Sequence, residues 1–232
     1  MSTFLQLCQR VASDSGTIDG TFPTAVTGQT GRLAKIVRWT NDAWRSIQNA
    51  HEGWLWLQSE FSGSTVAGTR NYAGSALGVA SRFGEFVYTG DKNENRYSIY
   101  KTSDGVAYER QLQFVPYDEF RTSLMRGTQT NGAPSYFTIG PNEQLKLHPI
   151  PDAVYTVIGP YRKDVQELAA DADTPEMPAR FHDIIADAAL MLLGTHDESQ
   201  GQLQLWQLRQ FAKWSALEQS QLPKMIWPKA FA

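Results

Sequence analysis

Two histidines near the C-terminus stand among carboxylates and are the first candidates for metal binding or acid–base chemistry. They are His182 and His196, and the nearby carboxylates are Asp183, Asp187, Asp197 and Glu198. Imidazole and carboxylate groups together can bind zinc or exchange protons. A spacing of five residues, however, does not place His182 and Asp187 on one face of a helix, and no His-Glu-x-x-His motif occurs. The pattern favours solvated helix ends, and we expect neither a metal nor a cofactor.

The other chemistry-bearing residues form no recognisable catalytic motif. Residues 28–32 lack the Gly-Lys-Ser/Thr ending of a phosphate-binding loop, and no Gly-x-Ser-x-Gly nucleophile elbow occurs. The single cysteine, Cys8, excludes an intrachain disulfide, and its apolar neighbours Leu7 and Val11 predict a packed core thiol. Scattered acids on a Tyr-rich β scaffold leave a carbohydrate-cleaving pair open as an alternative. These acids are Asp104, Glu109, Asp118 and Glu119. We predict no catalytic residue.

A basic stripe is a candidate for contact with nucleic acid. Lys35, Arg38 and Arg45 fall on one side of a predicted long helix, where they could meet phosphates as channel or interface charges. Asp42 lies among them, so a solvated helix face is the alternative. The net charge of −3 gives the whole chain no net attraction for DNA, so any contact with DNA would be local or repulsive.

Length and composition describe an ordinary globular chain. With 232 residues, of which 41% are hydrophobic, it can bury the core of one large or two modest domains. No apolar run approaches the roughly 20 residues of a membrane span, and the N-terminus lacks the order of a signal peptide. We expect no membrane contact, and a protein kept in the cytosol or in something assembled there.

A long amphipathic helix, residues 29–52, is the strongest structural signal. A short helix precedes it, with Thr3 as its expected cap and Ser15-Gly16 as its stop. The apolar face of the long helix runs for about six turns and needs a partner of equal length, which only segments beyond residue 178 can supply. The two chain ends must therefore meet. The apolar face consists of Leu33, Ile36, Val37, Thr40, Ala43, Trp44 and Ile47.

Short alternating runs in the middle of the chain predict a sheet. They are residues 85–88, 96–101, 106–114, 136–139, 144–148 and 154–160, with a short helix at 116–125. The predicted fold class is α+β, with a helical bundle built from both chain ends, a β-rich antiparallel insertion and an extended C-terminal tail. The predicted domains are residues 1–58 and 162–222 for the helical part, 59–161 for the insertion and 223–232 for the tail.

Two further helices are predicted near the C-terminus. The first starts near Ala179, is apolar nearly all round and should be buried. The second, residues 200–219, carries two apolar stripes, so that one can face the core while the other contacts a neighbouring subunit. The alternative is that one subunit covers both. The stripes are Leu203, Trp206, Trp214 and Leu217, and Leu205, Leu208 and Ala212. The candidate subunit-interface residues are Leu203, Leu205, Trp206, Leu208 and Trp214.

The last residues, 222–232, contain two prolines and cannot continue the helix, yet they are apolar. Free chain ends in water are usually polar. We therefore expect Met225, Ile226, Trp227 and Phe231 to dock onto another protein, with folding back onto the chain's own core as the alternative.

The order of several local strings resembles the head-to-tail adaptor (connector) proteins of tailed bacteriophages. The strings are residues 4–11, 28–39, 41–44, 47–48, 54–57, 133–136, 145–152, 155–157, 161–163 and 175–185, among them GQTGRLAKIVRW, LKLHPIPD and PEMPARFHDII. The resemblance implies a virion structural protein and not an enzyme. It implies one subunit of a dodecameric ring beneath the portal, which extends the DNA channel and gives the tail its attachment surface.

The resemblance also implies partners and a location. The partners are the portal protein, which the C-terminal tail would enter, neighbouring adaptor subunits, and a tail or nozzle protein. DNA would pass through the channel without sequence-specific binding, and the ring would form in the host cytoplasm and end at the head–tail junction of the virion. Two alternatives stay open, a tail-tube or tail-completion protein and a carbohydrate-binding tail module.

Overall fold

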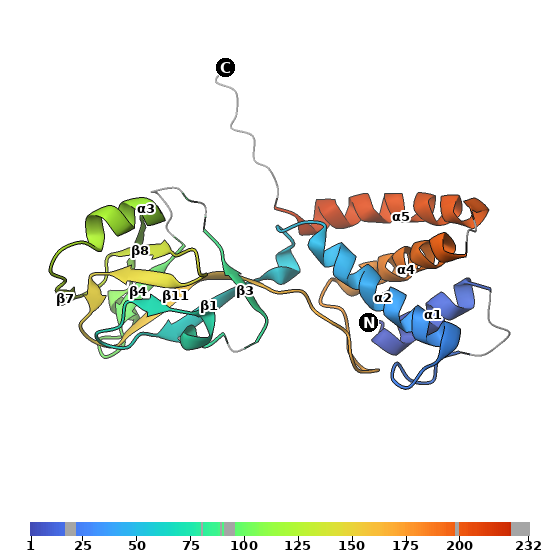
Figure 1. The fold of residues 1–232 in the computed structure, drawn as a ribbon, viewed down its shortest axis with the longest axis horizontal. Coiled ribbons are helices and arrows are strands. Elements are labelled where there is room, and N and C mark those ends of the chain that lie inside the picture. Colours follow the sequence, from blue (N-terminus) through green and yellow to red (C-terminus); the bar gives the residue numbers. More distant parts are fainter. Residues whose placement is uncertain (17–21, 80, 89, 91–95, 198–199, 224–232) are drawn as a thin grey trace, which may run out of the picture. The chain divides into compact units, whose positions relative to one another are not determined.

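The computed structural model describes residues 1–16, 22–79, 81–88, 90, 96–197 and 200–223. Its secondary structure is α+β, as predicted (Figure 1). The chain divides into two compact units: a helical unit, Met1–Trp56 with Val165–Ala232, and a β unit, Leu57–Asp164. No helix within the described ranges combines the length and apolar character of a membrane span.

The helical unit is built from segments at both ends of the chain. Helices α2 and α5 pack against α4, and α1 packs against α2 and α4. The predicted cap of α1 is confirmed, because the Thr3 side chain accepts a hydrogen bond from the Gln6 backbone while Gln6 accepts one from the Thr3 backbone. The bounds are Phe4–Asp14 for α1, Gly31–Asn49 for α2, Ala179–Phe181 for the 3₁₀ turn η5, Asp183–His196 for α4 and Gln200–Gln221 for α5.

Helix α2 ends at Asn49, three residues before the predicted end at residue 52. The side chain of Trp54 explains the early end. Its indole N–H donates to the Ile47 carbonyl at 2.9 Å. In a longer helix, a backbone N–H of the next turn would donate to that carbonyl instead. Trp54 is fully buried and stacks on Trp56 with ring centroids 4.4 Å apart. The tryptophans at the end of α2 therefore serve the core of the helical unit.

The β unit contains a five-stranded and a four-stranded sheet around an aromatic and aliphatic core, and a small two-stranded sheet formed by β7 and β10. The five-stranded sheet contains β1 (Gln58–Ser64), β11 (Tyr155–Lys163), β3 (Phe83–Phe86), β4 (Ser98–Lys101) and β5 (Arg110–Gln111). The four-stranded sheet has the order β2 (Asn71–Tyr72), β9 (Leu145–His148), β8 (Tyr136–Ile139) and β6 (Gln113–Phe114). The short helix η1 (Leu55–Leu57) spans the point in the sequence where the two units divide. The remaining elements of the β unit are η2 (Gly74–Leu77), η3 (Val106–Tyr108), α3 (Tyr117–Glu119), η4 (Phe120–Leu124), β7 (Asn131–Gly132) and β10 (Ile150–Pro151).

The β unit differs from the prediction in two respects. Pairs β6–β8 and β7–β10 are parallel, whereas the insertion was predicted to be antiparallel. The helical segment α3–η4 supplies the crossover that a parallel neighbour of β6 requires. The run predicted as one strand over 106–114 is broken: its first residues form η3 behind Gly105, which has φ +82, and two short strands follow.

Candidate assembly surface

Helix α5 is fixed to α4 by its first apolar stripe. Trp206 and Leu217 are buried, and Trp206 and Leu203 lie over Gly194 of α4. A Cβ at Gly194 would come within 2.7 Å of the Trp206 ring, so only glycine allows this close approach of the two helices. The stripe is therefore part of the interior of the helical unit.

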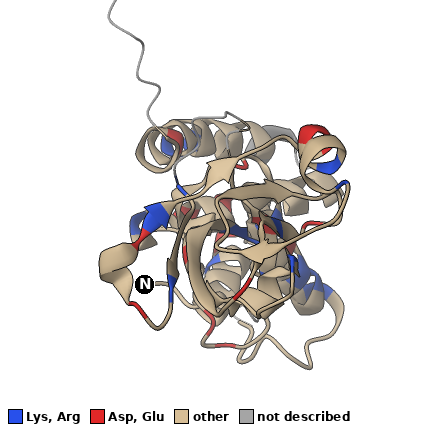
Figure 2. Ribbon diagram, turned by 90° about the vertical axis from the view of Figure 1, so that its left-hand side faces the viewer, with Lys and Arg blue, Asp and Glu red and all other residues tan. Residues whose placement is uncertain are grey.

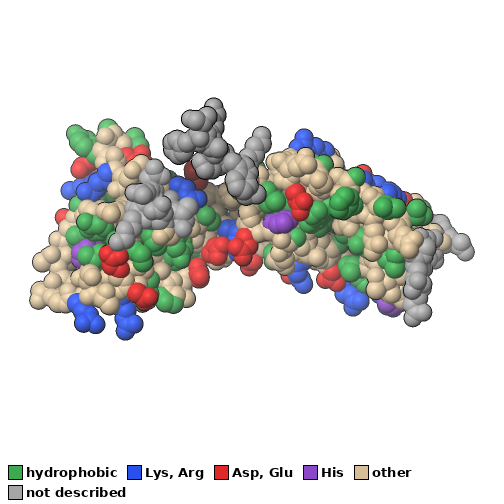
Figure 3. Space-filling view, turned by 90° about the horizontal axis from the view of Figure 1, so that it is seen from above, with side chains coloured by type: hydrophobic (Ala, Val, Ile, Leu, Met, Phe, Trp, Pro, Cys, Tyr) green, Lys and Arg blue, Asp and Glu red, His purple; other side chains and the backbone are tan. Residues whose placement is uncertain are grey.

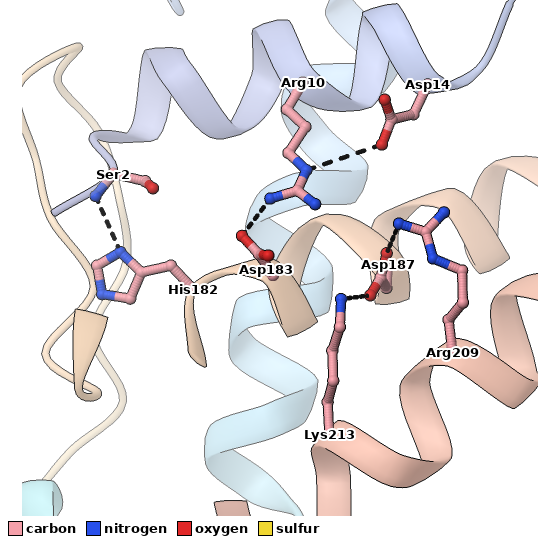
Figure 4. A network of polar contacts seen from close by, with 8 residues as sticks. All are labelled: Ser2, Arg10, Asp14, His182, Asp183, Asp187, Arg209 and Lys213. Atoms are coloured by element: carbon pink, nitrogen blue, oxygen red, sulfur yellow. Dashed lines mark hydrogen bonds and ion pairs between the residues drawn. The ribbon is translucent and has the colours of Figure 1, made fainter. Parts of the chain in front are cut away.

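A buried carboxylate adds a polar clamp between the same two helices (Figure 4). Asp187 of α4 has a fully buried side chain and accepts a hydrogen bond from Lys213 Nζ of α5 at 2.5 Å. Arg209 Nη2 of α5 lies 3.5 Å from its other oxygen. One turn earlier on α4, Arg10 of α1 pairs with Asp183. Since a buried carboxylate is costly without a cation, the clamp sets which face of α5 turns inward.

The opposite face of α5 is an exposed apolar ridge, which we call the α5 ridge. It consists of Leu205, Leu208 and Phe211, whose exposed fractions are 62%, 72% and 76%. Figure 3 shows hydrophobic side chains on the face of the helical unit that carries α5. Single exposed leucines are common, but three large apolar side chains within two turns of one helix are typical of a contact surface.

A groove in the same unit lies between α2, α4 and α5. It has a volume of about 370 Å³ and is lined mostly by small or apolar side chains. Ala43 and Ala50 come from α2, Ala188 and Leu192 from α4, and Trp214 from α5. We call it the helical groove. The unit thus presents both an apolar ridge and an apolar groove.

The five predicted interface residues divide between the two faces of α5. Leu205 and Leu208 are on the exposed ridge, whereas Leu203 and Trp206 pack on α4. Trp214 donates its indole N–H to Glu218 at 2.7 Å and lies edge-on against Trp54. The inward-facing residues are needed within the subunit, because they fill the space between α4, α5 and the end of α2. Leu203, Trp206 and Trp214 belong to one predicted stripe, and this is the stripe of α5 that faces the core.

Phe211 is the most exposed member of the ridge and was not predicted. It stands three residues after Leu208, which is the helical spacing of a shared face. The same periodicity that grouped Leu205 with Leu208 could therefore have found it.

The three predicted channel or interface charges all have partners within the chain. Lys35 Nζ lies 3.0 Å from His196 Nε2, and Arg45 pairs with Glu167. Arg38 is 4.0 Å from Asp42 one turn later, an exposed pair of small energetic weight. Figure 2, seen from the side of the β unit, shows Lys and Arg interspersed with Asp and Glu along the ribbon of the whole chain. All three basic residues are exposed, and their role as channel or interface charges stays a prediction.

His182 is not at a solvated helix end, so that prediction was wrong. Its side chain is buried, with Nδ1 accepting from the Ser2 backbone at 3.2 Å and Nε2 3.0 Å from the Met177 carbonyl. The ring turns inward because it joins the N-terminus to the loop before α4. His196, by contrast, is exposed. Within the described residues, no group of three His, Cys, Asp or Glu is placed to hold a metal ion.

The remaining chemistry candidates have ordinary structural surroundings. Cys8 is fully buried, as predicted, and burial raises the pKa of its thiol to about 12. The four acids considered for carbohydrate cleavage are exposed on the β unit. Asp104 accepts from Ser103 at 2.7 Å, and Glu109 accepts from Ser98. The predicted docking residues Met225, Ile226, Trp227 and Phe231 lie outside the described residues.

An ion pair joins the start of α2 to the end of α4 and predicts a pH dependence. Arg32 donates to Asp197, with Nη1 3.1 Å from Oδ1, and holds the pKa of that carboxyl well below its ordinary value of 3.8. Because the folded pKa is depressed, the pair stabilises the fold fully above about pH 4, and this stability is lost as the pH falls further. We expect Asp197→Asn to lower the free energy of unfolding at pH 7 by about 1 kcal/mol and to weaken its dependence on acid.

Urea unfolding at pH 7 and at pH 3 measures this effect. Asp42→Asn is the matched control, because Asp42 is in an exposed pair on the same helical unit. A loss for Asp197→Asn that is as large at pH 3 as at pH 7 would contradict the prediction, since the charge would then not be its cause.

The described residues of the helical unit thus present an apolar ridge and an apolar groove, which are surfaces typical of contacts between proteins. The model of the SU10 adaptor protein family matches residues 2–229. The chain belongs to this family and is a structural adaptor protein of a phage, a component of the virion that interacts with other head or tail proteins. The family is not a known enzyme family. No curated relative matches the chain.

Proposed function

We propose that the protein is a head-to-tail adaptor, one subunit of a homo-oligomeric ring beneath the portal of a tailed phage. The ring would extend the DNA channel and carry the tail, with a tail or nozzle protein below it. The observation that carries this proposal is the α5 ridge, because large apolar side chains that a subunit leaves in water are covered in its assembly.

A ring requires two different contact faces on each subunit, since neighbours in a closed cyclic assembly meet head to tail. The helical unit offers such a pair. We propose that Leu205 and Leu208 of one subunit enter the helical groove of the next, between Ala43 of α2 and Leu192 of α4. Both surfaces are apolar, so their contact buries no unpaired charge. The resemblance to head-to-tail adaptors implies that such a ring is a dodecamer.

The charge of the chain suits a channel through which DNA slides. A net charge of −3 gives no overall attraction for the phosphate backbone. The basic residues Lys35, Arg38 and Arg45 are each neighboured by a group of the same chain, so we assign them at most local contacts with DNA or with a neighbouring subunit. DNA would therefore pass without sequence-specific binding.

We propose that the C-terminal tail enters the portal, and this gives a direct experiment. Trp227→Ala combined with Phe231→Ala should weaken portal binding about a thousandfold, because two buried aromatic anchors at about 2 kcal/mol each account for about 4 kcal/mol. Cosedimentation with the purified portal, followed by electron microscopy, measures the loss. The matched control is Lys224→Ala with Lys229→Ala, which changes the same tail without removing an aromatic ring.

Three outcomes decide the proposal. Portal particles that carry a ring of the unmodified protein and of the lysine control, but not of the aromatic variant, would support it. Equal binding of the aromatic variant would contradict the role of the tail. Association of the unmodified protein with purified tail proteins in place of the portal would overturn the position and favour a tail-completion protein.

A further inference from the structure

The outer face of the four-stranded sheet carries polar groups that the proposed assembly does not use. Along β8 and β9, Phe137, Ile139, Leu145 and Leu147 point into the core of the β unit. Because side chains alternate along a strand, the residues between them share the other face. The register sets Thr138 opposite Lys146 and Tyr136 opposite His148. Lys146 and His148, two residues apart on β9, are therefore on the same outer face of the sheet.

A helical segment lies against this face, part of which is buried. Phe120 of η4 lies edge-on against His148, with ring centroids 6.1 Å apart, and Figure 1 shows α3 beside β8. Lys146 is only 7% exposed and Thr138 is fully buried. Lysine is almost never buried to this degree without a charged partner.

Arg70 joins the cluster from the segment before β2, the edge strand of the sheet. Its backbone carbonyl accepts from Leu147 on β9 at 3.0 Å, and its guanidinium donates to Gln129, which follows η4. Burial lowers the pKa of Arg70, and burial together with the charge of Arg70 lowers the pKa values of Lys146 and His148. The three groups are therefore close enough to disfavour one another's positive charge.

The cluster has cations but no anion within the described part of the chain. Lys146 Nζ contacts the amide oxygen of Asn71 at 3.2 Å, and Arg70 also meets only an amide oxygen. Three buried polar atoms of this cluster have no hydrogen-bond partner: Arg70 Nε, Thr138 Oγ1 and His148 Nδ1. Unpaired buried polar atoms are rare in folded proteins, because each one loses its hydrogen bonds to water without a replacement.

We propose that this face is a binding site for a small tetrahedral oxyanion, phosphate or sulfate, held by Arg70, Lys146 and His148 with Thr138 as a neutral donor. An oxyanion supplies several acceptor oxygens and a negative charge at once, which the cluster lacks. A small ion fits better than a nucleic acid, because the unpaired atoms are buried and His148 lies against Phe120 of η4. The site would tie the segment before β2 to β9 and stabilise the β unit.

The test follows the His148 ring of the full-length protein by NMR during titration with sodium phosphate, against sodium chloride at equal ionic strength. We expect a saturable shift of the His148 resonances with phosphate only. Lys146→Met and Arg70→Met should each weaken binding at least tenfold. Lys101→Met is the control, because Lys101 is an exposed lysine on β4 of the other sheet, and it should bind as the unmodified protein does.

The outcomes separate the sources of the anion. A saturable shift with phosphate that both cluster variants lose supports the proposal. No saturable shift of the unmodified protein overturns it, whatever the stability of the variants. A shift with a short DNA duplex and none with phosphate also overturns it, since the occupant would then be a nucleic-acid backbone. The site uses none of the residues proposed for the ring or the portal, so its failure leaves the proposed function unaffected.

Discussion

Trp54→Ala is expected to destabilise the helical unit by about 4 kcal/mol and to lower its melting temperature by at least about 10 °C. Trp54 is fully buried, stacks on Trp56 and meets the edge of the Trp214 ring. Truncation opens a cavity between the end of α2 and α5. It also leaves the Ile47 carbonyl without the indole donor that ends the helix.

Circular dichroism at 222 nm during heating measures the loss without depending on tryptophan fluorescence. Trp54→Phe is the matched variant, because it keeps an aromatic ring in the core and removes mainly the indole N–H. It should cost about 1–2 kcal/mol. A Trp54→Ala protein that melts within a few degrees of the unmodified one would show that the tryptophan cluster does not hold α2 and α5 together.

Local signals predicted the elements whose stability is local. The capping residue Thr3 and the apolar spacing of α1 are both present within a few residues of sequence, and the helix forms as expected. Strand β8 matches its prediction at both ends, because Tyr136–Ile139 alternates and is followed by a Gly-Pro-Asn turn. The two stripes of α5 also follow from periodicity alone, since one is buried on α4 and the other is exposed.

The features that the sequence did not reveal depend on contacts between distant residues. His182 is buried because the Ser2 backbone, at the other end of the chain, donates to it. The cluster of Arg70, Lys146 and His148 requires the pairing of β2 with β9, and no local sequence pattern predicts that pairing. The parallel pairing of β6 with β8 likewise depends on how the chain crosses over α3 and η4. Tertiary contacts, and not propensity, decide each of these.

Leu205→Glu combined with Leu208→Glu should abolish the proposed ring. Each leucine is expected to contribute about 2 kcal/mol when it enters a neighbour's groove, and a glutamate there would in addition be buried without a cation. The combined loss of at least about 4 kcal/mol per interface weakens each contact about a thousandfold, and a ring repeats that loss at every interface. The fold itself should be unaffected, because both side chains are exposed in the subunit.

The matched control is Ala216→Glu with Gln219→Glu, which adds the same charge to exposed positions of the same helix beyond the last ridge residue. Electron microscopy of mixtures with the portal should show rings for the unmodified protein and for the control, but none for the ridge variant. Rings formed by the ridge variant would remove the α5 ridge from the subunit interface. Loss of rings in the control as well would assign the effect to the charge of α5, and the pairing of ridge with groove would then lack support.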